Sequence, residues 1–148
     1  MQLSIGYGIL VAAVAGLLIG TQAPLTNLLR QELGLWGMAV GVHVAGLTVA
    51  LWVMLTIERQ AARSWSSWWW LILVTGIGGL GILVALSMAV GRLGAATALG
   101  ISIAVQLSAT VAIDHFGWLG VELRPLTWTR ALGAVLLLAG ARLVIGRG

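Results

Sequence analysis

Residues 68–90 have the sequence WWWLILVTGIGGLGILVALSMAV, a continuous stretch without a charged side chain. A helix needs about 20 apolar residues to cross the ~30 Å hydrocarbon core of a bilayer. Three tryptophans stand at the amino end of the stretch, and amphipathic aromatic rings favour the membrane–water interface. The stretch therefore predicts a transmembrane helix with an interfacial anchor at its start.

The rest of the chain repeats this pattern on both sides. Short polar connectors at 30–32, 58–67, 91–94 and 114–125 separate the apolar runs. The last run carries arginines only near its ends, where their side chains can extend to the interfaces. We expect an all-α, integral membrane bundle of five transmembrane helices, forming one domain over residues 1–148. The predicted spans are 3–29, 35–57, 68–90, 94–114 and 126–145.

The composition excludes most other classes of protein. Hydrophobic residues make up 60% of the 148 positions and charged residues 8%, against about 25% charged residues in a soluble domain. The net charge of +4 comes from arginines scattered at the ends of apolar runs, which is typical of membrane flanks and not of a nucleic-acid surface. Cysteine is absent, and we predict no cofactor and no metal site. The first apolar run has no preceding basic residue, so we expect it to be kept as a helix and not cleaved as a secretory signal.

Small residues recur every fourth position in several of the predicted helices. In lipid, helices associate where small residues let their backbones approach closely. Such stripes therefore predict helix packing faces, although glycine and alanine are also simply common in this chain. The two longest stripes are Gly8, Ala12, Gly16 and Gly20 in the first span, and Ala96, Gly100, Ala104, Ser108 and Ala112 in the fourth.

Five spans would divide the arginines equally between the two sides of the membrane. One side would hold Arg59, Arg63, Arg124 and Arg130, and the other Arg30, Arg92, Arg142 and Arg147. Because an excess of Lys and Arg in cytoplasmic loops sets orientation, this balance favours insertion in both directions. The alternative is that a partner or the kinetics of insertion fixes a single orientation.

Polar side chains inside apolar runs are costly in lipid and are therefore candidates for function. Gln22 and Asn27 bracket Pro24 near the end of the first run. Because proline removes a backbone donor, this segment is either a broken helix that presents its amides to a substrate, or an interfacial helix end whose amides only hold helices together.

Four further residues are candidates in the second and fourth runs. His43 is the side chain inside a span that titrates nearest neutral pH, so it is a candidate for proton coupling or a packing residue bonded to a carbonyl. Gln106 and Ser102 share a face of the fourth helix and line a path or bond to a neighbouring helix. Asp114, at the end of that run, either couples transport to a cation or proton or pairs with a loop arginine.

Gly76–Gly81 matches the dinucleotide-binding pattern G-x-G-x-x-G. That pattern requires a strand before it and an acidic residue about 20 positions later. Here it lies within an apolar helix, so we reject a nucleotide site. The spacing of nucleophilic, basic and acidic side chains also offers no hydrolytic constellation, and we do not expect an enzyme.

Several segments in order resemble the YdcZ-type family, a half-length, five-helix branch of the drug/metabolite transporter superfamily related to small multidrug resistance transporters. The matching pieces are Gln22 with 27–29, Trp69 and Trp70 ahead of 78–81, residues 92–97, Gln106, and residues 113–117. Two positions depart from the pattern, because His43 replaces a usual aromatic residue and Val105 a usual glycine. The acidic residue that small multidrug resistance transporters carry in their first helix has no counterpart in the first 31 residues.

The resemblance implies a transporter half in a bacterial-type inner membrane. Longer relatives contain two inverted five-helix repeats, so a half-length chain is expected to pair with a second, oppositely oriented copy as an antiparallel (dual-topology) homodimer. The predicted function is alternating-access transport of a small solute, with Gln22, Asn27, His43, Ser102 and Gln106 along the path and His43 or Asp114 as the coupling site. A non-transporting membrane subunit and a small channel remain as alternatives.

Overall fold

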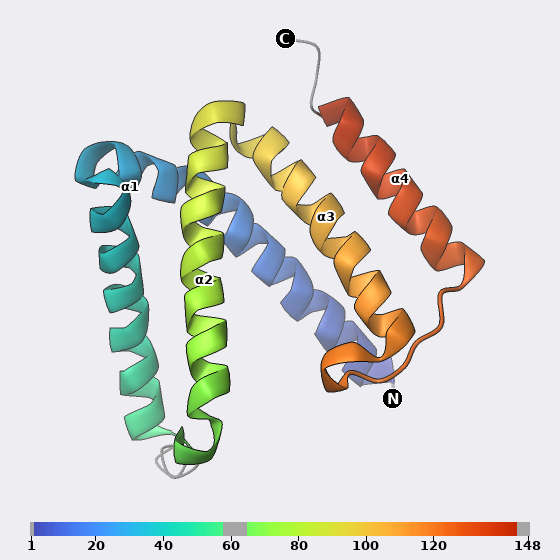
Figure 1. Cartoon of the computed structure of the whole chain (residues 1–148), viewed down its shortest axis with the longest axis horizontal. Helices are drawn as coiled ribbons and strands as arrows, with labels where there is room; N and C mark the ends of the chain where they lie inside the picture. Colours follow the sequence, from blue (N-terminus) through green and yellow to red (C-terminus); the bar gives the residue numbers. More distant parts are fainter. Residues whose placement is uncertain (1, 58–64, 145–148) are drawn as a thin grey trace. The chain divides into compact units, whose positions relative to one another are not determined.

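The computed structural model describes residues 2–57 and 65–144, and the surroundings of side chains in 5–57 and 67–144. These residues form four α-helices and one short 3-10 helix (Figure 1). The elements are α1 (Gln2–Thr56), α2 (Trp65–Leu93), α3 (Ala95–Phe116), η2 (Trp118–Gly120) and α4 (Trp128–Val144). The all-α class is confirmed, but four α-helices stand where five were expected. The chain forms two compact units, Met1–Met88 and Ala89–Gly148.

The first two predicted spans lie in the single element α1. The expected connector at residues 30–32 is helical, and Gly34, with φ 74° and ψ 170°, is the residue inside α1 that leaves the helical conformation. Figure 1 shows α1 turning sharply into two arms at this bend. Arginine, glutamine and glutamate are good helix formers, whereas glycine reaches positive φ without a steric penalty. The prediction of a loop at 30–32 was therefore wrong, and the chain changes direction at Gly34.

The end of α2 and the start of α3 meet at a one-residue turn. Gly94 has φ 79° and ψ 159°; its N–H donates to the Val90 carbonyl over 2.9 Å, and its own carbonyl accepts the N–H of Ala98 over 3.1 Å. The turn expected at 91–94 is thus confirmed, although residues 91–93 still belong to α2. The glycine-rich segment 76–81 lies inside α2, as expected.

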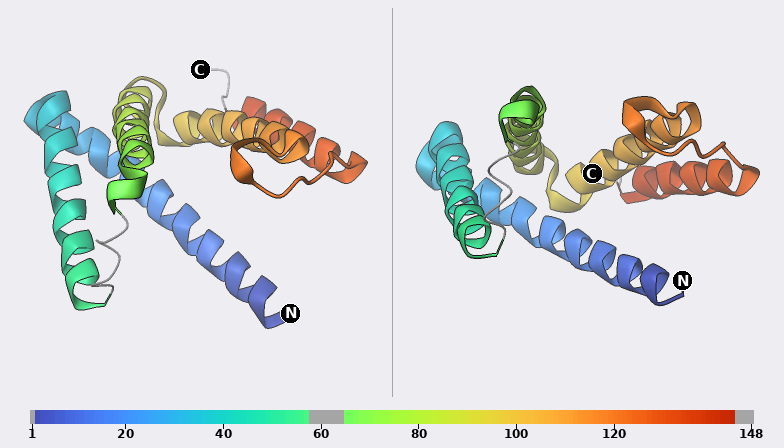
Figure 2. Two further views of the ribbon diagram at one scale, coloured as in Figure 1. Left: turned by 60° about the horizontal axis from the view of Figure 1, so that its bottom comes forward. Right: turned by 90° about the horizontal axis from the view of Figure 1, so that it is seen from below.

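Helices α3 and α4 pack side by side in antiparallel directions (Figures 1 and 2). At one end of the pair, a Cβ added to Gly100 would lie 4.0 Å from the Cα of Ala141 and from Cγ1 of Val144. At the other end, Asp114 lies beside Arg130. The small-residue stripe predicted on α3 is therefore a packing face where Gly100 meets α4.

The corresponding stripe on α1 is open. A Cβ added to Gly8, Gly16 or Gly20 would meet no atom within 4 Å. Within the unit of residues 1–88, the described residues leave the space beside these glycines open.

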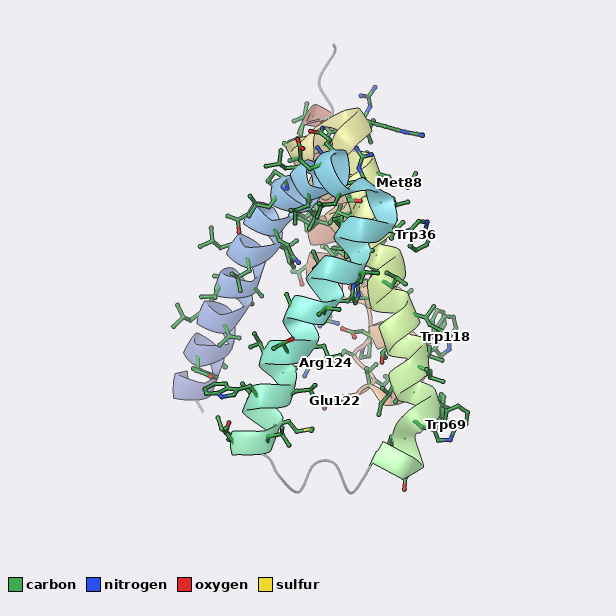
Figure 3. All side chains as sticks on the ribbon, turned by 90° about the vertical axis from the view of Figure 1, so that its left-hand side faces the viewer. Trp36, Trp69, Met88, Trp118, Glu122 and Arg124 are labelled. Carbon is green, nitrogen blue, oxygen red and sulfur yellow. The ribbon has the colours of Figure 1, made fainter. Side chains whose placement is uncertain are left out.

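Among the described residues, three helices are long and apolar enough to cross a membrane, namely α1, α2 and α3. Their large apolar side chains are mostly exposed, and Figure 3 shows Trp36 and Trp69 projecting from their helices. Such exposure is unfavourable in water and ordinary in lipid. The fourth helix has 17 residues, about 25 Å at 1.5 Å per residue, slightly less than the hydrocarbon thickness. The second predicted connector and the last predicted span extend into 58–64 and 145–148, which lie outside the described residues together with Arg59, Arg63 and Arg147.

Candidate functional site

The segment around Pro24 stays helical. Pro24 lies inside α1 with helical neighbours, and its missing N–H removes the donor that would normally bond the carbonyl of Gly20. The helix is therefore continuous from Gln22 to Asn27, and the helix break or helix end expected at this segment does not occur. The two amides are five positions apart, about 140° around a helix of 3.6 residues per turn, so they do not share a face.

Asn27 forms a hydrogen bond with Arg30, a residue that was predicted to lie in the first connector. Its Oδ1 accepts a hydrogen bond from Nη2 of Arg30 over 2.9 Å, and both residues are half-buried. The Nε of Arg30 is buried and has no hydrogen-bond partner in the described part of the chain. In contrast, Gln22 is exposed, and no other described residue bonds to its side chain.

His43 is exposed on the second arm of α1 and bonds to its own helix. Its Nδ1 lies 2.8 Å from the carbonyl oxygen of Ala39. A carbonyl oxygen only accepts, so Nδ1 carries the proton and Nε2 is left as the acceptor. This is the carbonyl contact of a packing histidine, and Nε2 has no hydrogen-bond partner among the described residues.

Gln106 and Ser102 lie one turn apart on α3, and both are exposed. Within residues 5–57 and 67–144, neither side chain bonds to another group of the protein. From the helical repeat, Gln106 lies about 90° around α3 from the residues that face α4. The pair therefore shares an open side of α3, as expected from the sequence.

Asp114 pairs with an arginine of α4. Its Oδ2 lies 3.6 Å from Nη1 of Arg130, and the two side chains are 34% and 36% exposed. Arg130 belongs to the first turn of α4 and not to a loop. The pair stands at one end of a crevice of about 260 Å³ between the two helices, hereafter the α3–α4 crevice. Its lining residues are Leu107, Thr110, Val111, Asp114, Arg130, Gly133, Ala134 and Leu137.

Hydrogen bonds hold the connector between α3 and α4 against the charged end of this crevice. The N–H of Arg124 donates to the carbonyl of Asp114 over 2.8 Å, and Nη1 of Arg130 donates to the carbonyl of Arg124 over 3.4 Å. The N–H of Leu126 donates to Nδ1 of His115 over 3.1 Å, so that nitrogen is unprotonated. The side chain of Arg124 instead pairs with exposed Glu122 over 3.0 Å (labelled in Figure 3).

Arg30 and Arg130 contact the candidate residues but were not identified from the sequence. Arg30 was assigned to a loop and Arg130 to an interface, because a single chain does not reveal which acceptor an arginine meets. The available signal was spacing: Arg30 follows Asn27 by three positions, where side chains on a helix meet. The described residues contain no group of three or more His, Cys, Asp or Glu side chains able to hold a metal ion.

The comparison with known families agrees with the helical, apolar architecture. A family described as "Putative inner membrane exporter, YdcZ" matches residues 7–143. The chain belongs to this family. It is accordingly a multi-pass protein of the inner membrane, and the YdcZ family is one of exporters and not of enzymes. No curated protein and no solved structure matches the chain.

Proposed function

We propose that this YdcZ-family chain is one half of a secondary transporter, which moves a small solute by alternating access as a dimer. The observation that carries the proposal is the family match, which extends over nearly the whole chain. The apolar helices α1, α2 and α3 support it, because each is long enough to cross the bilayer.

In this proposal the chain crosses the membrane five times. The two arms of α1 on either side of Gly34 make the first two crossings, and α2, α3 and α4 make the others. Gly34 then lies at a membrane surface, where a change of direction is required. Helix α4 is short, but Arg130 and Arg142 near its ends can extend their side chains to the interfaces.

The functional unit in this proposal is an antiparallel homodimer. Five crossings leave four arginines on each side, so no excess of positive charge selects one orientation. The open face at Gly8, Gly16 and Gly20 supports association, since nothing lies within 4 Å of an added Cβ there and small residues permit close helix approach in lipid. Two inverted copies would be related by a two-fold axis in the membrane plane.

The solute path would lie between the copies near the mid-plane. Gln22, Ser102 and Gln106 are exposed on apolar helices and unbonded within the described residues, so a polar path in the dimer would offset their cost in lipid. Asn27 and His43 complete the path. His43, through Nε2, or Asp114, through its carboxylate, would couple transport to protons or cations.

Transport by purified protein in proteoliposomes tests the proposal. The probes are labelled tetraphenylphosphonium, L-leucine and D-glucose, which represent a cation, a zwitterion and a neutral solute. Saturable counterflow of a probe, lost in Gln106→Leu and kept in the neighbouring Ser108→Ala, is expected. Flux at channel rates would favour a pore, and no flux of any probe would favour a non-transporting subunit; either result contradicts the proposal.

Two charge variants test the dimer. Two lysines added after Gly148 tip the arginine and lysine balance to favour one orientation, and Gln60→Lys with Ala61→Lys favours the other. Each variant expressed alone should lose activity, and co-expression should restore it. Full activity of either variant alone would refute the antiparallel arrangement.

A further inference from the structure

The α3–α4 crevice is a polar-ended slot separate from the proposed path. None of Gln22, Asn27, His43, Ser102 or Gln106 lines it. Each helix contributes lining residues at positions i, i+3, i+4 and i+7, which share one helical face. The slot is therefore formed by the packing of α3 on α4 within one copy, and its geometry does not depend on a dimer.

The charged end of the slot has unused bonding capacity. The 3.6 Å between Asp114 and Arg130 exceeds the ~2.7–2.9 Å of a charge-assisted hydrogen bond. Among the described residues, the carboxylate of Asp114 has no closer side-chain partner. Arg130 uses Nη1 for its contacts, and a guanidinium has five N–H donors. Both charged groups therefore have hydrogen-bonding capacity left for a ligand.

The other end of the slot is apolar. Leu107 lies seven positions before Asp114, and Leu137 lies seven positions after Arg130, so the lining extends about 10 Å along each helix at 1.5 Å per residue. Gly133 and Ala134 leave room between these ends. The volume of about 260 Å³ lies below the ~300–1,000 Å³ of sites for drug-sized molecules. A ligand the size of an amino acid fits this space.

The ion pair restricts the charge of such a ligand. A cation alone would bind Asp114 and leave Arg130 without its counter-ion, and an anion alone would do the reverse. Either ligand would leave one charge of this partly exposed pair without a close counter-charge, which is unfavourable. A molecule that carries both charges next to an apolar group satisfies both residues. We propose that the α3–α4 crevice binds a small zwitterion with an apolar side chain, of the amino-acid class.

The helix ends favour one orientation of this ligand. Asp114 lies at the carboxyl end of α3 and Arg130 in the first turn of α4. A helix carries partial negative charge at its carboxyl end and partial positive charge at its amino end. The ligand's ammonium is therefore placed at Asp114 and its carboxylate at Arg130, with the side chain directed toward Leu107 and Leu137.

Binding of labelled L-leucine to the purified full-length protein in detergent tests the ligand class without any transport assay. The competitors are L-leucine methyl ester, which keeps the ammonium alone, and N-acetyl-L-leucine, which keeps the carboxylate alone. Saturable L-leucine binding is expected, with each competitor at least tenfold weaker than L-leucine. No saturable binding, or equal affinity for the three compounds, would overturn the proposal.

Three variants test the location. Asp114→Asn and Ala134→Leu should each weaken L-leucine binding at least tenfold, the first by removing a charge and the second by filling the slot with the ion pair intact. Arg124→Gln, on the exposed connector, is the matched control and should bind normally. Thermal unfolding of each variant separates lost binding from lost folding, and Ala134→Leu keeps the test valid if Asp114→Asn does not fold. Unchanged binding by Ala134→Leu would overturn the site.

The outcome is distinguishable from that of the transporter proposal. Leucine binding without flux of any probe would support this site and contradict transport. Flux of another probe without leucine binding would support transport and contradict this site.

Discussion

The bend in α1 depends on a backbone conformation that only glycine adopts readily. Gly34 has φ 74° and ψ 170°, a region that costs a residue with a Cβ about 1–3 kcal/mol. Alanine also favours a straight helix over glycine by about 1 kcal/mol. In the proposed five-crossing arrangement the apolar second arm stays in the membrane, so the bend persists and the folded state bears the strain. Gly34→Ala should therefore lower the free energy of unfolding by about 2–4 kcal/mol.

Two other glycines calibrate this measurement. Gly94 has nearly the same conformation, with φ 79° and ψ 159°, so Gly94→Ala should destabilise similarly. Gly81 lies inside α2 with nothing within 4 Å of an added Cβ, and Gly81→Ala should be neutral or stabilising by about 1 kcal/mol.

Unfolding by SDS in mixed micelles, followed by the fluorescence of the eight tryptophans, reports the free energy of each variant. If Gly34→Ala were as stable as Gly81→Ala, α1 would not bend at Gly34, and the first two crossings would need a different connection.

Substitutions at four further residues address the proposed path and the helix packing. Gln106→Leu should abolish counterflow with little change in stability, and a collapse of stability would show that the glutamine only holds helices together. Asn27→Leu should also abolish counterflow, and it should lower the free energy of unfolding by about 1 kcal/mol because Arg30 loses its acceptor. His43→Phe should remove the pH dependence of exchange if Nε2 is the coupling nitrogen, and an unchanged pH profile would exclude it. Gly100→Ala should leave the free energy of unfolding unchanged because the added Cβ meets α4 at ordinary contact distance. Gly100→Leu should lower it by about 1–3 kcal/mol by overpacking. Equal unfolding midpoints for the two variants would contradict the packing of α3 on α4.

Much of the architecture could be predicted because the bilayer imposes it. Charge-free runs of about 20 residues have few alternatives in a membrane protein, and α2 at Trp65–Leu93 contains the predicted span 68–90. The first connector was misplaced because polarity alone suggested a loop. A helix has no reason to end at three good helix formers, and the decisive residue was the glycine two positions further on.

The candidate residues were predictable as polar exceptions, but their contacts were not. Asn27 and Arg30, or Asp114 and Arg130, bond because of helix phase and packing register. Register depends on shape complementarity between helices, which periodicity does not specify. In the proposed dimer, the roles of Gln22 and Gln106 depend on a second copy, and the sequence of one chain does not specify where that copy lies.

The antiparallel dimer can be tested most directly by the location of the carboxyl terminus in intact cells. The chain has no native cysteine, so one cysteine added after Gly148 is a unique label site. A membrane-impermeant maleimide, applied before and after permeabilisation of the inner membrane, should label two comparable populations, one from each side. Labelling from one side only would contradict dual insertion and leave a parallel dimer or a different partner.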